Sequence, residues 1–194
     1  MSQDITTSVV LAGVGGQGIL LASEIVARAA MNAGFDVKTN EVHGMAQRGG
    51  SVIAQIRYGA KVHSPLVPEG TATVLGALEQ IEGIRFAHYL APGGLAVVSS
   101  QAIVPVTVSN GQAVYPRDTR ARLEAIFPRL AYLDADTLAT QAGNLRAANV
   151  VILGAMSAAL ALPAEAWQAA ITSSIPPRHH AINLRAFQLG RESA

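Results

Sequence analysis

The sequence lacks cysteine altogether, although it is 194 residues long. Structural disulfides, thiolate zinc sites and cysteine-ligated iron–sulfur clusters all need cysteine side chains. None of these groups can therefore belong to this chain. A covalent thiol nucleophile is excluded for the same reason.

Charge is also scarce, because only 14% of the residues are charged, against roughly 25% in an ordinary soluble domain. The net charge of +1 argues against a nucleic-acid partner, since such binding depends on neutralising phosphates. Half of the residues are hydrophobic, which excludes a disordered chain. The apolar surplus suggests surface that is hidden against another subunit, or against a second copy when the chain is isolated.

No segment is typical of a membrane span or a targeting signal. The longest uncharged stretch, residues 147–164, contains Asn149 and Pro163 and is mostly alanine, whereas a bilayer span needs ~20 strongly apolar residues. Residues 1–8 carry Asp4 and no basic cluster, unlike a signal peptide. We therefore expect a cytoplasmic protein with no membrane partner.

Strand-like and helix-like apolar patterns alternate along the chain. Residues 8–12 predict a short buried strand, a helix with one apolar face follows from Ile19 and is predicted to end at Gly34, and residues 36–42 predict a second strand. These form one βαβ unit, for which a right-handed parallel crossover is expected. Further strands are expected at 72–75, 95–99 and 130–133, and helices at 79–90, 118–127, 147–162, 163–174 and 181–189.

This order predicts one α/β domain over residues 1–194, with three α/β/α layers, a Rossmann-like and mostly parallel sheet, and a helical C-terminal third. Alternation over 52–56 predicts a half-exposed strand, and 58–61 an antiparallel hairpin turn. A second hairpin is expected around Asn110-Gly111. Gly190 is predicted to end the last helix.

A glycine loop separates the first strand from the first helix. Its residues are Gly13, Gly15, Gly16, Gln17 and Gly18. Glycine allows close backbone approach, and the first amides of a helix attract anions. The pattern G-x-G-x-x-G leaves three interpretations open: a turn that only permits packing, a site for an anion other than a dinucleotide, or an NAD(P) or FAD site. Glu41 is an acceptable ribose-binding acid, but the segment that follows it is foreign to a standard dinucleotide fold.

The polar, glycine-flanked segment that follows Glu41 is the second candidate for a site. His43 can serve as an acid, a base or a hydrogen-bond donor, and Arg48 offers a fork of donors for carboxylate or phosphate. The structural alternative pairs Arg48 with Glu41 and bonds His43 to a carbonyl. The candidates for ligand binding or subunit contact are His43, Gln47, Arg48, Gly49 and Gly50. No residue is assigned to catalysis or to a metal.

Several segments together resemble one protein family. They are Gly-Val-Gly-Gly-Gln-Gly-Ile-Leu at 13–20, Glu-Val-His-Gly-Met-Ala-Gln-Arg-Gly-Gly-Ser-Val at 41–52, Ser-Pro-Leu-Val-Pro-Glu-Gly at 64–70, and the segments 144–154 and 183–190. The chain resembles the gamma subunits of 2-oxoacid:ferredoxin oxidoreductases, and within them most resembles the beta subunits of indolepyruvate:ferredoxin oxidoreductases. Residues 100–140 carry little of this resemblance.

The resemblance implies an accessory subunit of a hetero-oligomeric enzyme. Such enzymes couple oxidative decarboxylation of a 2-oxoacid, such as indolepyruvate or pyruvate, to ferredoxin reduction, usually forming an acyl-CoA. Thiamine diphosphate, Mg²⁺ and [4Fe–4S] clusters are expected on partner subunits, because this chain has no cysteine and no Gly-Asp-Gly motif with paired asparagines. Coenzyme A is a possible substrate facing residues 13–18 and 43–50, and ferredoxin is expected to be reached through the complex. Two alternatives stay open: a stand-alone NAD- or FAD-dependent oxidoreductase, and a ligand-free interaction module.

Overall fold

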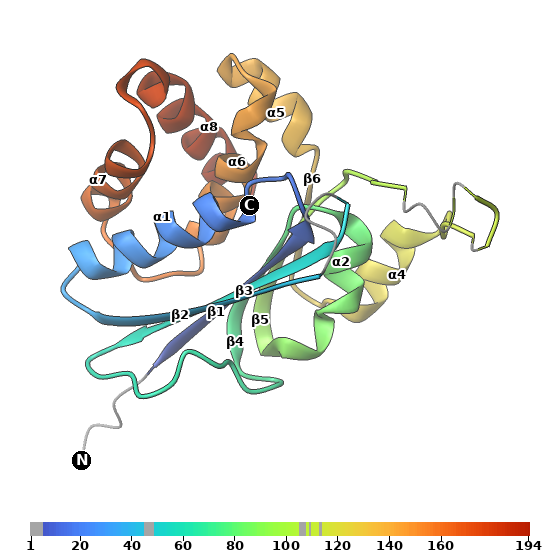
Figure 1. Ribbon diagram of the computed structural model, residues 1–194, viewed down its shortest axis with the longest axis horizontal. Helices are drawn as coiled ribbons and strands as arrows, with labels where there is room; N and C mark the ends of the chain where they lie inside the picture. The colour runs from blue at the N-terminus through green and yellow to red at the C-terminus, as the bar shows by residue number, and fades with distance from the viewer. Residues whose placement is uncertain (1–5, 45–48, 105–107, 109, 113) are drawn as a thin grey trace.

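The computed structural model describes residues 6–44, 49–104, 108, 110–112 and 114–194. Its centre is a six-stranded sheet in the order β2-β3-β1-β4-β5-β6 (Figure 1). The strands are β1 (Thr7–Val14), β2 (Asp36–His43), β3 (Ser51–Gly59), β4 (Ala72–Ala77), β5 (Leu90–Ser99) and β6 (Leu130–Leu133). The α-helices are α1 (Ile19–Asn32), α2 (Gln80–Arg85), α4 (Thr119–Ile126), α5 (Ala135–Ala142), α6 (Ala148–Ser157), α7 (Ala164–Ser174) and α8 (His180–Glu192). Short 3₁₀ turns are η1 (Ala87–Tyr89), η2 (Leu145–Ala147) and η3 (Pro177–His179).

The sheet is mostly parallel, as predicted, but its antiparallel hairpin lies elsewhere in the chain. β3 runs antiparallel to both of its neighbours, β1 and β2, while β1, β4, β5 and β6 are parallel to one another. The hairpin is therefore β2–β3. The hairpin turn predicted at 58–61 is wrong, because no strand follows it before β4, and the described residues between 104 and 115 contain no strand. β1 and β2 point the same way but are not adjacent, because β3 lies between them.

The prediction that β3 is half-exposed is also wrong. Ile53 and Ala54 point to opposite faces of the sheet, and both are buried. Gln55 is only 5% exposed because the connector between β3 and β4 covers that face. Val67 of this connector donates its backbone N–H to the Gln55 side chain at 2.9 Å and packs into the core beside Ile53.

The three predicted layers are confirmed. Along β1, Val9 and Leu11 face one core, and Val10 faces the other. Helices α1, α5, α6, α7 and α8 cover the first face, and α2 and α4 cover the second (Figure 1). Among the described residues, no helix has the length and hydropathy to cross a bilayer.

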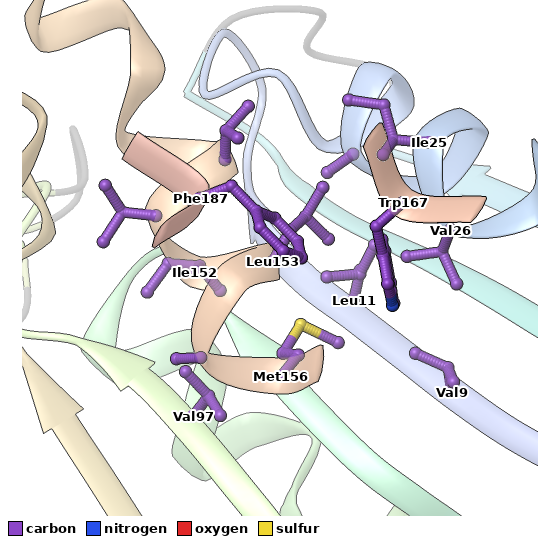
Figure 2. Packing of buried hydrophobic residues seen from close by; sticks show 14 of the residues in the cluster. Val9, Leu11, Ile25, Val26, Val97, Ile152, Leu153, Met156, Trp167 and Phe187 are labelled. Carbon is purple, nitrogen blue, oxygen red and sulfur yellow. The ribbon is translucent and has the colours of Figure 1, made fainter. Parts of the chain in front are cut away.

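The larger core joins the helical C-terminal third to the sheet. Trp167 of α7 and Phe187 of α8 place their rings 5.3 Å apart, close to Met156 of α6 (Figure 2). The prediction that Gly190 ends the last helix is wrong. Gly190 lies buried inside α8, which continues to Glu192. A Cβ on Gly190 would lie 1.9 Å from the Val151 carbonyl oxygen, so glycine is needed there for the close approach of α6 and α8.

Two other helices differ in length from their predictions. The segment 79–90 forms only the short α2 and η1, because β5 already begins at Leu90. α6 ends at Ser157 rather than at residue 162. By contrast, Gly34 ends α1 as its sequence suggests. Its φ is +86°, and Phe35 N–H donates to Ala30 O at 3.1 Å, the pairing of a Schellman motif.

Candidate functional site

The glycine loop lies where β1 ends and α1 begins, at the carboxyl end of the parallel strands. This edge is where open α/β sheets bind their ligands. A Cβ on Gly13 would lie 2.6 Å from the Ile19 side chain and 2.8 Å from Gln17 Oε1, so a larger residue there would displace both side chains. Gly16 and Gly18 have φ angles of +107° and +79°, which residues other than glycine rarely adopt. The loop therefore needs its glycines for both space and conformation.

Two of the loop's amides are already bonded within the chain. Gly15 N–H donates to Gly50 O at 2.8 Å, and Gln17 N–H donates to Val14 O at 3.1 Å. Neither Gly16 N nor Gly18 N has a hydrogen-bond partner within the described part of the chain. The anion site expected from the amides of residues 15–18 is thus reduced to two donors.

Gln17 is the residue that fixes the loop in place. Its side-chain Oε1 accepts from Val14 N–H at 2.7 Å, and its Nε2 donates to Leu78 O at 2.7 Å. The same Nε2 also donates to the Gln101 side chain. Because Leu78 follows β4 and Gln101 follows β5, one amide group ties together the ends of three neighbouring strands.

The structure brings the glycine loop and the polar segment that follows Glu41 close together. Gly49 N–H lies 3.4 Å from Gly15 O, so the segment before β3 runs beside the glycine loop. His43 and Gly44 line a cavity of about 720 Å³ together with loop residues and Leu20; we call it the His43 cavity. Gln47 and Arg48 lie outside the described residues.

The dinucleotide interpretation conflicts with this arrangement. Glu41, its ribose-binding acid, accepts a hydrogen bond from Ser23 Oγ of α1 at 2.5 Å and so faces the helix. β2 is also one strand further from β1 than a βαβ mononucleotide unit requires, because β3 fills the intervening position. The strand beside β1 is antiparallel and presents its amino end, Ser51, at this edge.

A second cavity, of about 500 Å³, lies on the other side of the glycine loop. We call it the loop cavity. Its polar lining comes from residues 15–18 and from Ser99, Gln101, Asp136, Arg146 and Asn149. The Asn149 side chain, which is 4% exposed, donates to Gly18 O at 3.2 Å. Both cavities have volumes typical of small-molecule sites.

Among the described residues, the lining of the loop cavity contains one carboxyl group and one guanidinium group. Asp136 accepts from Gln101 Nε2 at 3.0 Å. Burial, together with the neighbouring Asp134 carboxylate, raises the pKa of Asp136. Arg146 is exposed and is the cation that lines this cavity. An anionic ligand would be attracted by Arg146 and repelled by ionised Asp136.

Gln101, Asp136, Arg146 and Asn149 were absent from the sequence-based candidates. They come from three segments: Gln101 follows β5, Asp136 lies at the start of α5 after β6, and Arg146 and Asn149 belong to the continuous stretch of η2 and α6. The signal that could have found Gln101 and Asp136 is their position just after predicted strands, where α/β sheets gather their binding residues. Over the described residues, no group of histidine and acidic side chains could hold a metal ion.

Comparison with known proteins places the whole chain in one group. The family described as pyruvate ferredoxin/flavodoxin oxidoreductase matches residues 8–193. Indolepyruvate oxidoreductase subunit IorB of Thermococcus kodakarensis is 42% identical over 192 residues, which cover 96% of this chain and 95% of that protein. The same subunit of Pyrococcus horikoshii is 42% identical over the same shares of both chains. The gamma subunit of a keto/oxoacid ferredoxin oxidoreductase from Geobacter sulfurreducens superimposes with a TM-score of 0.71 at 25% identity, covering 97% of this chain and 98% of that chain.

Proposed function

The chain belongs to the pyruvate ferredoxin/flavodoxin oxidoreductase family, and we propose that it is the small accessory subunit of a cytoplasmic 2-oxoacid:ferredoxin oxidoreductase. The observation that carries this proposal is the 42% identity to an indolepyruvate oxidoreductase subunit over nearly the full length of both chains. The substrate that this likeness favours is indolepyruvate or a related 2-oxoacid. We further propose that residues 1–194 act as one domain within the complex.

The redox centres belong on partner subunits in this proposal. A cysteine-bound cluster does not fit this chain, because its sequence has no cysteine. On such partners thiamine diphosphate, with its Mg²⁺, would supply the carbanion chemistry, and [4Fe–4S] clusters would supply the one-electron chemistry that ferredoxin needs. The 2-oxoacid loses CO₂, its acyl group is transferred to the sulfur of coenzyme A, and two electrons reduce two ferredoxins. This chain completes the complex rather than carrying out a redox step.

The carboxyl edge of the sheet is the surface that we assign to the catalytic partner. Three large apolar side chains are exposed there, with 47% of Leu20, 53% of Val42 and 55% of Leu145 accessible. They come from the start of α1, the end of β2 and the turn before α6; Leu20 lines the His43 cavity and Leu145 lines the loop cavity. Exposed apolar side chains at this edge support a subunit contact.

Coenzyme A is the ligand that we assign to the loop cavity. Its phosphates match Arg146 and the amides of Gly16 and Gly18, and anions bind well at helix N-termini. Arg48 remains our further candidate for a phosphate contact. In the assembled enzyme, Arg48→Ala is expected to raise the KM for coenzyme A. An unchanged KM with intact assembly would remove that role.

Reconstitution tests the proposal. The chain and the thiamine-binding subunit of the same organism are purified separately and together, and reduction of ferredoxin or a viologen dye is followed with indolepyruvate and coenzyme A. We expect association by analytical ultracentrifugation and activity only in the mixture. Activity of this chain alone would refute the accessory role, and association without coenzyme A binding in a calorimetric titration would favour a ligand-free interaction module. Binding of NADH or FAD by the isolated chain would instead support a stand-alone oxidoreductase.

A further inference from the structure

Glu79 is a buried carboxylate with more partners than a helix cap requires. It directly precedes α2 and is 2% exposed. Its Oε2 accepts from Ile81 N–H at 2.7 Å and from Glu82 N–H at 3.0 Å, which satisfies the start of the helix. Its Oε1 accepts from Tyr115 OH at 2.6 Å and from Ile103 N–H at 3.2 Å. One carboxyl oxygen therefore accepts hydrogen bonds from α2, and the other accepts them from a segment more than twenty residues away in the sequence.

That segment is the connector between β5 and α4, and its first residues line the loop cavity. Gln101 and Ile103 belong to the cavity wall. Gln101 O accepts the backbone N–H of Gln80 at 3.1 Å, and its side chain donates to Asp136. Together with the hydrogen bond from Ile103 N–H to Glu79, these contacts hold the cavity wall at the residues before and after residue 102.

Tyr115 fastens the far end of the connector to the same carboxylate. Burial raises the pKa of the Tyr115 hydroxyl, and its hydrogen bond to Glu79 raises it further. The phenol therefore keeps its proton at neutral pH and acts as a donor to Glu79. Gln80 Nε2 donates in turn to the phenol oxygen at 3.1 Å, so both capacities of the hydroxyl are used.

We propose that Glu79 and Tyr115 are positioning residues that hold residues 101–103 as the wall of the loop cavity and thereby set the affinity for its anionic ligand. The proposal rests on the assignment of coenzyme A to this cavity. A hydrogen bond to a charged group is about twice as strong as one between neutral groups, so the pair can hold Ile103 and Gln101 in one place. Tyr115 lies in the part of the chain, residues 100–140, that carries little of the family resemblance.

Tyr115→Phe separates this role from helix capping. The variant loses only the phenol oxygen and leaves Glu79 Oε2 on α2. The matched control is Tyr132→Phe, whose hydroxyl donates to the Gln80 side chain at 3.0 Å but has no hydrogen bond to the described residues of the connector. Two readouts are used: hydrogen exchange of the peptide that contains residues 100–104 in the isolated chain, and kcat and KM for coenzyme A in the reconstituted complex.

We expect Tyr115→Phe to speed exchange of that peptide about tenfold and to raise the KM for coenzyme A by a similar factor, with kcat unchanged. Tyr132→Phe should change neither quantity. Wild-type exchange in Tyr115→Phe would overturn the proposal, and so would faster exchange with an unchanged KM. A wild-type complex that turns over without coenzyme A would refute the ligand assignment instead. The exchange result would then decide whether the pair holds the connector.

Discussion

One added methyl group at Gly154 tests how closely α6 and α8 must pack. An alanine Cβ there would lie 2.0 Å from the Phe187 carbonyl oxygen and 2.8 Å from its carbon, whereas nonbonded carbon atoms prefer about 3.5–4.0 Å. The colliding atoms belong to the backbone of α8, so no side-chain rotation can relieve the contact. The two helices would have to separate by roughly 1 Å or more.

Two effects oppose each other in Gly154→Ala. Alanine favours a helix over glycine by about 1 kcal/mol, whereas overpacking a buried site costs about 1–3 kcal/mol, and occasionally more. Because the clash is with backbone and because separation also loosens the packing of Phe187 on Trp167, we place the cost above that range. The expected net loss is about 2 kcal/mol or more of the free energy of unfolding. For a chain of this size, that lowers Tm by roughly 4–8 °C.

Urea and thermal unfolding followed by circular dichroism measure this loss. The control is Gln188→Ala on the exposed face of α8, which should stay within about 0.5 kcal/mol of the parent chain. A Tm for Gly154→Ala equal to or above that of the parent would mean that helix propensity outweighs packing. The close approach of the two helices described above would then be incorrect.

Three further substitutions concern the glycine loop and the loop cavity. Gln17→Leu removes the three hydrogen bonds of that side chain and should cost about 2–4 kcal/mol in urea unfolding, with unaltered stability contradicting its role as the tie between strand ends. Because the raised pKa of Asp136 makes the folded chain hold that proton to higher pH than the unfolded chain, the parent loses stability as pH rises through this raised pKa. Asp136→Asn should therefore gain stability relative to the parent over the same interval, and urea midpoints that differ equally at all pH values would refute this. Arg146→Ala should weaken calorimetric binding of coenzyme A about tenfold, while Arg178→Ala, a surface change on η3, should have no effect; equal losses in both would indicate nonspecific charge attraction.

Local patterns in the sequence predicted most of the elements. The period of α1 and its end at Gly34 depend on neighbours within a few residues, and both are confirmed. The exposure of β3 was predicted wrongly. Its alternating polar residues suggest a solvent-exposed face, whereas Gln55 is buried by Val67 from the following connector. Gly190 was misjudged because a glycine near a helix end usually stops it, and only the partner helix reveals the close approach. Both errors concern contacts between distant segments.

In the candidate site, too, the local features were predicted and the contacts between distant segments were not. The glycine loop and His43 were found from their own residue types, and the structure places them at one edge of the sheet. Their joining through Gly15 and Gly50 could not be predicted, since it depends on β3 pairing with β1. Gln101 and Asp136 are ordinary polar residues in sequence, and only the order of the strands makes them neighbours.

β2 leaves one long border of the sheet open to solvent. Strand borders of this kind can recruit other chains into intermolecular sheets, a hazard that natural proteins limit with charge. Lys38 and Asp36 form an exposed pair on this border, 2.9 Å apart, and most of the strand is polar. In a chain that is half hydrophobic, we expect these charges to disfavour pairing of β2 with other chains before the subunit is assembled.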